Sequence, residues 1–324
     1  MHQEGIGMYL FRRKLVCSVV VLWLFTHQAL GDDTEVSSIG EAYCANWLAV
    51  TSYDVLMTVS EFRISDRGVS MERVTSHRQI VDHENETFWM GSRTEVEQLS
   101  AAGVSVKRHL MSVSCYDGRT GEEWMKSSGR NAMRLAGDDF LKALHRSREP
   151  DPRWTGVLVA EYAYAGKTLE ESFSTNYSPT KEFRLHSRTG MTVDLSVKVP
   201  VSPGISHVIE LVRFDTNRWV PTMLTQTFFL RERSEPRLRE VYEWEEREGI
   251  YLPVKVRGEH NMNVMSGGER SETPLVYDVD FQWLSVNNGK KDREKWSVGL
   301  MSDSERVLKM LDPQDAEGVK DAER

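Results

Sequence analysis

The stretch "LREVYEWEEREGIYLPVKVRGEH", Leu238 to His260, decides the fold class of this chain. Apolar and polar residues alternate on both sides of Gly249, which is typical of two half-buried strands joined by a tight turn. A three-residue loop over 247–249, with the glycine in the left-handed conformation, predicts that Trp244 faces Leu252. The apolar face of this hairpin then consists of Leu238, Tyr242, Trp244, Ile250, Leu252, Val254 and Val256.

Five glutamates lie within nine residues of this stretch, from Glu240 to Glu248. One interpretation is a solvated outer face, with Glu243 diagonal to Lys255. The other is that Glu243 and Glu245, about 7 Å apart on one strand, are the acid and base of a β-sandwich glycosidase. Basic residues across the hairpin keep both carboxylates ionised, which favours the solvated face.

The same two-residue alternation recurs along most of the chain, for example at "YDVLMTVS" from Tyr53 and "MTVDLSVKVP" from Met191. Roughly ten to twelve short strands are expected, separated by polar turns. No long helical pattern separates any two of them, which excludes parallel βαβ units. The sequence therefore predicts a mainly β fold built from an antiparallel sheet, with a few short accessory helices.

Three segments make up the predicted organisation. Residues 1–31 combine the basic run Arg12 to Lys14, the apolar run "LVCSVVVLWLF" and a terminal "ALG", which is typical of a cleaved secretory signal peptide. An uncleaved N-terminal anchor is the alternative, and it would be the one lasting contact with a membrane. Residues 32–286 form a single β-rich domain, and 287–324 form a charged C-terminal extension. The predicted location is therefore periplasmic or extracellular.

Charge argues against one class of partner. The 324 residues include 41 basic and 49 acidic side chains, a formal net charge of -8. Removing residues 1–31 takes away three basic and one acidic side chain, which leaves 38 and 48 and a net charge of -10. No basic stripe remains to follow a phosphate backbone, so we expect no nucleic-acid partner.

Short helices are expected on either side of the strands. Ser38 and Glu41 have the spacing of a capping box, and Ile39, Tyr43 and Trp47 share one face of the helix that follows. A second helix is expected near "DDFLKAL" from Asp138, and a third at "SDSERVLKML" from Ser302. The charged residues beyond Pro313 are expected to be disordered.

Cysteine and histidine give no sign of a metal or redox site. Cys44 and Cys115 remain after removal of the signal peptide, and they are either a disulfide or two buried thiols. They form no C-x-x-C pair, and the histidines have no ligand spacing. No nucleophile or phosphate-loop motif survives inspection. We therefore expect that the protein binds no metal and no cofactor and has no enzymatic activity.

The late strands carry a family resemblance. "VIELVRFDTNRWVPTMLTQTFF" from Val208, followed by "YEWEEREGIYLPVKV" from Tyr242, resembles the bacterial outer-membrane lipoprotein-sorting (LolA/LolB-like) family. In that family a similar strand leads into a hairpin ending "D-G-I-W-L-P", which "EGIYLP" approximates. The resemblance implies a half-open β-barrel whose concave side holds acyl chains, with helices as a lid. It defines no residue motif that transfers to named positions.

The function expected on this basis is binding of a hydrophobic ligand or lipoprotein acyl chain by a non-enzymatic exported protein. The alternative within the same fold is a structural or interaction protein whose interior is filled by its own side chains. The aromatic residues expected to line the concave face are Phe62, Trp89, Trp124, Phe173, Phe214, Trp219, Phe228 and Trp244.

Overall fold

The structure is a computed structural model that describes part of the chain. The described residues are 35–36, 38–65, 68–99, 105–119, 121–126, 133–135, 144, 152–156, 184–202, 206–230, 233–266, 269–288 and 311. The predicted signal peptide lies outside them, as do Phe173 and nearly all of the C-terminal extension.

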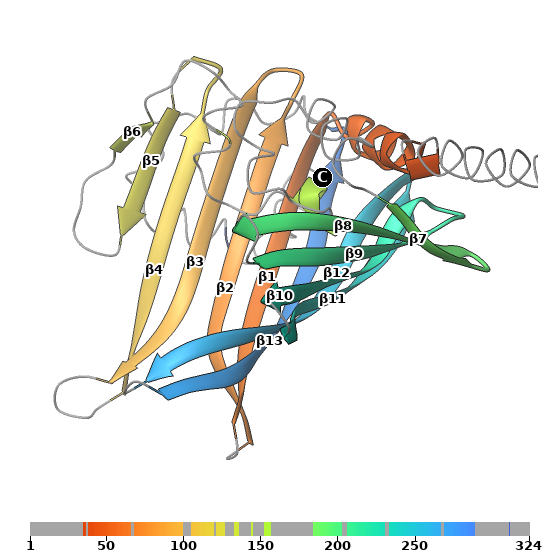
Figure 1. The fold of residues 1–324 in the computed structure, drawn as a ribbon. Coiled ribbons are helices and arrows are strands. Elements are labelled where there is room, and N and C mark those ends of the chain that lie inside the picture. Colours follow the sequence, from red (N-terminus) through yellow and green to blue (C-terminus); the bar gives the residue numbers. More distant parts are fainter. Residues whose placement is uncertain are drawn as a thin grey trace, which may run out of the picture.

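One antiparallel sheet of 13 strands forms the body of the molecule (Figure 1). Its first meander contains β1 (Ser52–Ser65), β2 (Gly68–Asp82), β3 (Thr87–Leu99), β4 (Ser105–Tyr116), β5 (Gly121–Lys126) and β6 (Met133–Leu135). Its second contains β7 (Arg184–Thr189), β8 (Thr192–Ser202), β9 (Ser206–Asp215), β10 (Val220–Leu230), β11 (Arg233–Arg247), β12 (Ile250–Ser266) and β13 (Glu269–Val286). The two meanders join where β1 pairs with β13.

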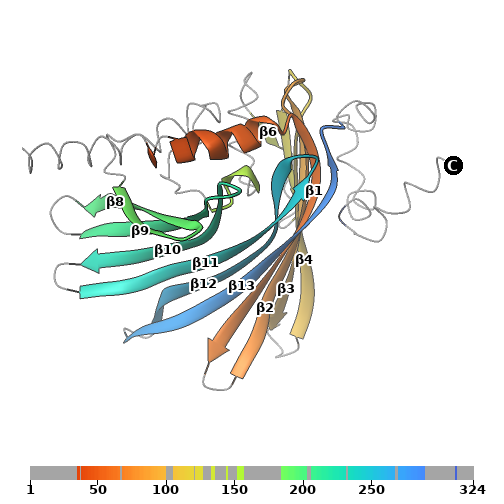
Figure 2. The ribbon, with the colours of Figure 1, turned by 90° about the vertical axis from the view of Figure 1, so that its right-hand side faces the viewer.

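The sheet is strongly curved and stays open. Figure 2 shows the strands bending around a concave side, and the two edge strands, β6 and β7, are not paired with each other. This confirms the predicted mainly β fold and its half-open barrel shape. The described residues contain one strand more than the upper end of the expected range.

A helix that precedes β1 packs against the concave side. It includes residues 35–36 and 38–48, and Ile39, Tyr43 and Trp47 are each 0% exposed, as their four-residue spacing predicts. Ser38 does not cap this helix, because helical backbone already occurs at residues 35–36 and the Ser38 hydroxyl donates to the Glu35 carbonyl 2.9 Å away. The predicted helix start is therefore wrong by about one turn.

The Leu238–His260 hairpin forms, but its predicted register is wrong. Arg247 pairs with Ile250, so the turn has two residues, Glu248 and Gly249, with φ of 53° and 80°. Two consecutive left-handed residues are the signature of a type I′ turn, whose backbone twist matches the right-handed twist of the two strands. Trp244 therefore faces Pro253, and the register shifts at a bulge between it and Glu243.

Burial in this hairpin follows the predicted apolar face with one exception. Tyr242, Ile250, Leu252 and Val256 are buried, and Leu238 and Trp244 pack against the core. Val254 is only half-buried, because it is the extra residue on β12 at the bulge.

Alternation along each strand separates an inner face, on which the helix packs, from an outer face. On β1 the inner face carries Tyr53, Val55 and Met57, which belong to the main hydrophobic core. The outer face of β1 carries Asp54, whose carboxylate pairs with Arg78 at 2.7 Å. Outer-face pairs continue across the sheet, with Lys255 and Asp280 3.1 Å apart.

Three short pieces outside the sheet are described. A 3₁₀ turn, η1 (Pro152–Trp154), carries the buried Arg153. Leu144 is helical and packs against the core, and Leu311 is buried. The rest of the two later helices predicted from the sequence lies outside the described residues. In the described part of the chain, no helix is both long and apolar enough to cross a membrane.

Candidate functional site

An aromatic cluster fills the end of the inner face that the helix covers. Tyr43 meets Phe214 and Trp244 edge-on, with ring centroids 5.9 and 6.2 Å apart. Trp47 lies 6.3 Å from Trp244 and 6.4 Å from Trp283, again between ring centroids. These contacts join the helix to β9, β11 and β13, so this end of the concave side is filled by the protein's own side chains.

Hydrogen bonds to backbone fix the helix in this position. The Asn46 amide donates to the Tyr251 carbonyl at 2.9 Å and accepts from the Tyr251 N–H at 2.8 Å. The Tyr43 hydroxyl donates to the Thr155 carbonyl at 2.7 Å. Because three partners lie on two segments far apart in sequence, the helix is anchored as well as packed.

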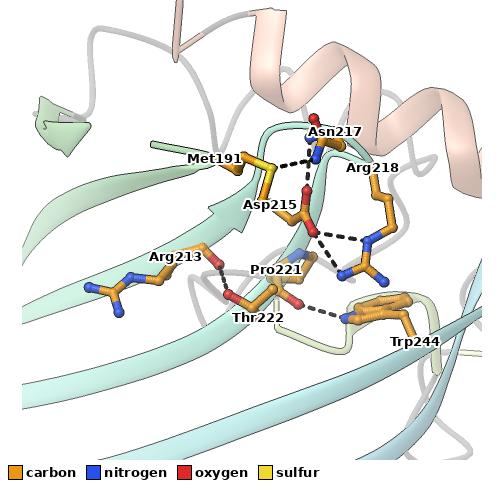
Figure 3. A network of polar contacts seen from close by, with 8 residues as sticks. All are labelled: Met191, Arg213, Asp215, Asn217, Arg218, Pro221, Thr222 and Trp244. Atoms are coloured by element: carbon orange, nitrogen blue, oxygen red, sulfur yellow. Dashed lines mark hydrogen bonds and ion pairs between the residues drawn. The ribbon is translucent and has the colours of Figure 1, made fainter. Parts of the chain in front are cut away.

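The turn between β9 and β10 supports the same cluster (Figure 3). Trp244 donates its indole N–H to the Pro221 carbonyl at 2.6 Å, which fixes the ring against the helix. Arg218 donates two hydrogen bonds to Asp215, and the Asn217 N–H donates a third. Burial alone would raise the pKa of Asp215, but these donors and the Arg218 charge outweigh it and lower that pKa.

Beyond the helix, the inner face stays apolar but is only half-buried. Leu238, Val279 and Phe281 lie there and pack against the core. Val279 pairs with Val256, and Val256 with Tyr242, which places all three on one face. From Trp283 to Tyr277 along β13 is six residues, or about 20 Å, so this surface extends well past the aromatic cluster.

Two carboxylates lie on the described part of this face. Glu61 on β1 pairs with Tyr277 and is bonded by Arg73 from β2, and Glu240 lies on β11. Glu240 precedes Tyr242 by two residues on β11 and therefore shares its face. The hydroxyls of Tyr242 and Tyr277 both donate to it, the first to Oε2 and the second to Oε1. Tyr277 reaches Glu240 from β13 by crossing β12 at Gly258, which pairs with both residues.

Burial and the nearby Glu240 charge raise the pKa of Tyr242 and that of Tyr277. Both phenols therefore stay protonated over the physiological range and remain donors. The Glu240 carboxyl group is then an acceptor that two neutral hydroxyl donors hold in place.

The eight aromatic residues predicted to line the concave side do not all lie on the same face of the sheet. Phe214, Phe228 and Trp244 lie on the inner face, and Trp219 lies in the β9–β10 turn against the core. Phe62 faces Val276 and Trp89 faces Cys115, positions that alternation places on the outer face. The structure does not describe the side chain of Trp124 or any part of Phe173.

Glu243 and Glu245 lie on the outer face, away from the helix. Glu243 is exposed, and its backbone lies opposite that of Lys255 in the hairpin ladder. Glu245 accepts a hydrogen bond from Arg247 on its own strand. This arrangement is that of a solvated hairpin face.

The described cysteine, histidine and acidic side chains were compared with the expectation of a disulfide or a metal site. Cys44 and Cys115 are both buried and are not bonded to each other. Within the described residues, no group of three or more His, Cys, Asp or Glu side chains is placed to hold a metal ion.

Glu240 is not among the residues that the sequence marks as a candidate site. The signal was present, because Glu240 stands between Leu238 and Tyr242 in a series that otherwise alternates apolar residues. Its partner Tyr277 is 37 residues away. That contact depends on the order of three strands, which no local pattern reveals.

Comparison with known proteins gives only distant similarity. No protein-family model matches the chain, and the search of curated proteins finds no match. Among solved structures, a domain described as an outer membrane lipoprotein-sorting protein of Vibrio parahaemolyticus matches with a TM-score of 0.36 and 10% identity. That match covers 80% of this chain and 96% of the other.

A second similar structure is a DUF1329 family protein from Desulfovibrio piger. It matches with a TM-score of 0.39 and 10% identity, and it covers 82% of this chain and 98% of the other. One of these two structures is thus described by the family that the late strands resemble. Similarity at this level concerns the fold alone.

Proposed function

We propose that this protein is an exported, non-enzymatic carrier that binds an apolar ligand, such as an acyl chain, on the inner face of its curved sheet. The observation that carries the proposal is the half-buried apolar surface formed by Leu238, Val279 and Phe281 next to the filled aromatic cluster. An apolar surface on the concave side of a curved sheet is where a long, thin hydrophobic ligand gains most contact.

The helix supports this proposal by its position. It closes one end of the concave side through Tyr43 and Trp47 and leaves the surface around Phe281 outside its ring contacts. A ligand chain lying along β11 to β13 would end against the aromatic cluster. Each methylene group removed from water would contribute about 0.8 kcal/mol, so an acyl chain could bind without any polar contact.

Export is the second part of the proposal. It is supported by the basic, apolar and small-residue pattern of residues 1–31. Intact-mass measurement of the chain recovered from the producing cell tests it directly. A mature N-terminus at Asp32 supports cleavage, whereas an intact N-terminus in the membrane fraction supports the retained anchor.

Native mass spectrometry of the mature chain tests the binding itself. We expect a co-purified lipid or fatty acid that adds a discrete mass. Replacing Phe281 with Asp should remove this mass, because a charge on the inner face opposes an apolar ligand. Replacing Glu243 with Gln on the outer face is the matched control. A chain that stays ligand-free after exposure to lipid extract would favour the filled-core structural role instead.

A further inference from the structure

Glu240 differs from two other half-buried or buried carboxylates, Asp54 and Asp194, in what it contacts. Asp54 and Asp194 each pair with an arginine on a neighbouring strand, at 2.7 Å in both cases. Within the described residues, Glu240 has no ion-pair partner, and its contacts are the hydroxyls of Tyr242 and Tyr277. In this part of the structure the half-buried carboxyl group of Glu240 is therefore held by neutral donors.

This arrangement leaves acceptor positions open. A carboxylate can accept about four hydrogen bonds, and the two tyrosines provide one to each oxygen of Glu240. The next residue along the sheet toward β10 is Leu224, which is 6% exposed and apolar. A charge in such surroundings is costly unless it is paired, so a positive group would be favoured there.

Gly258 shows that the arrangement depends on a specific residue choice. A Cβ on Gly258 would lie 2.1 Å from Cζ of Tyr277, far closer than atoms can approach. The absence of a side chain therefore lets the Tyr277 ring lie across β12 and reach Glu240 on β11. Three neighbouring strands contribute to one polar position, and on the far side of Tyr277 the same face continues to the ion pair of Glu61 and Arg73.

We infer that Glu240, held by Tyr242 and Tyr277, binds the protonated amine head group of an amphiphile whose apolar chain lies along the inner face toward Val279 and Phe281. This inference rests on the proposed function and names the class of ligand. An ammonium group supplies both the missing positive charge and the donors that fit a carboxylate. Carboxylate or phosphate head groups would be repelled from the same position.

Three single-chain probes of equal length separate these possibilities. Dodecylamine, dodecanol and dodecanoate are each titrated into the mature chain below their micelle concentrations, with binding followed by calorimetry. We expect dodecylamine to bind at least about tenfold more tightly than the other two, which is the effect of one charge-assisted hydrogen bond. This comparison needs no variant, so it stands even if a substitution disturbs folding.

Glu240→Gln then tests the residue. It should reduce dodecylamine binding to the level of dodecanol and leave dodecanol binding unchanged. Glu243→Gln, three residues away on the outer face, should keep the preference for the amine.

Equal binding of all three probes would overturn the inference and leave the proposed function intact. Failure of every probe to bind would overturn both. A preference for the amine that persists in Glu240→Gln would remove Glu240 from the site.

Discussion

The two ends of the inner face differ in how deeply their side chains are buried. Under the helix, Tyr43, Trp47 and Phe214 are each 0% exposed and their rings meet edge-on. Further along the same strands, Val279 and Phe281 are only half-buried and a carboxylate replaces an aromatic ring. The first end is a packed core, and the second is a half-buried surface of apolar residues.

The largest effect is expected at the covered end. Trp47→Ala should lower the free energy of unfolding by about 3–5 kcal/mol, because it removes a fully buried ring that contacts three other aromatic residues. Urea unfolding measures this loss. Leu48→Ala is the matched control, since Leu48 is adjacent in the helix but 50% exposed. Equal losses in the two variants would mean that the helix does not pack as described.

Gly258→Ala should have the next largest effect. The added methyl group overlaps the Tyr277 ring, and overpacking of this kind costs about 1–3 kcal/mol. In a Tyr277→Ala background the same substitution should cost much less, because the ring is gone. A double-mutant cycle by chemical unfolding measures the coupling, and additive losses would show that the ring does not cross Gly258.

Acid should weaken the outer face at Asp194. A hydrogen bond from Arg213 lowers the pKa of this carboxyl in the folded state, and burial opposes that effect only partly. A folded-state pKa below the ordinary value contributes stability above about pH 4, and this stability is lost as pH falls through the folded-state pKa. Because Arg213 is partly exposed, the effect should be about 1 kcal/mol or less.

Asp194→Asn tests that assignment. Its unfolding free energy should fall less steeply than that of the parent chain as the pH is lowered below about 4, the ordinary carboxyl value. Identical pH dependence in both chains would show that Asp194 does not contribute to acid sensitivity.

The smallest effect is expected at the outer glutamates. Glu243→Gln should change stability by less than about 0.5 kcal/mol, because Glu243 is exposed and carries no described ion pair. A larger loss, measured in the same urea experiment, would show that the outer face of the hairpin contributes more than its exposure indicates.

Sequence reasoning worked where the physics is local. Two-residue alternation identified the sheet, and the spacing of Ile39, Tyr43 and Trp47 identified the buried face of the helix. It failed where one residue changes the geometry. Because Glu248 adopts a left-handed conformation, the turn has two residues instead of the three expected, and the strand register differs from the predicted one. Tyr242 and Leu252 are nevertheless buried, as predicted.

The site was harder to predict than the fold. Aromatic content alone could not separate inner from outer positions, since Phe62 and Trp89 become outer-face residues only once strand register is known. The Glu240 position also depends on three strands meeting at Gly258. Such contacts come from the order of the strands in the sheet, which a single sequence without homologues does not specify.

Photo-crosslinking with an alkyl chain that carries a diazirine tests the central claim most directly. The probe is bound to the mature chain, irradiated, and the modified residues are located by peptide mass spectrometry. We predict labelling on the inner face of β11 to β13, at residues such as Leu238, Val279 and Phe281, and competition by unlabelled amphiphile. Labelling that falls on the outer face, or that no competitor reduces, would contradict the proposal that the concave side binds an apolar ligand.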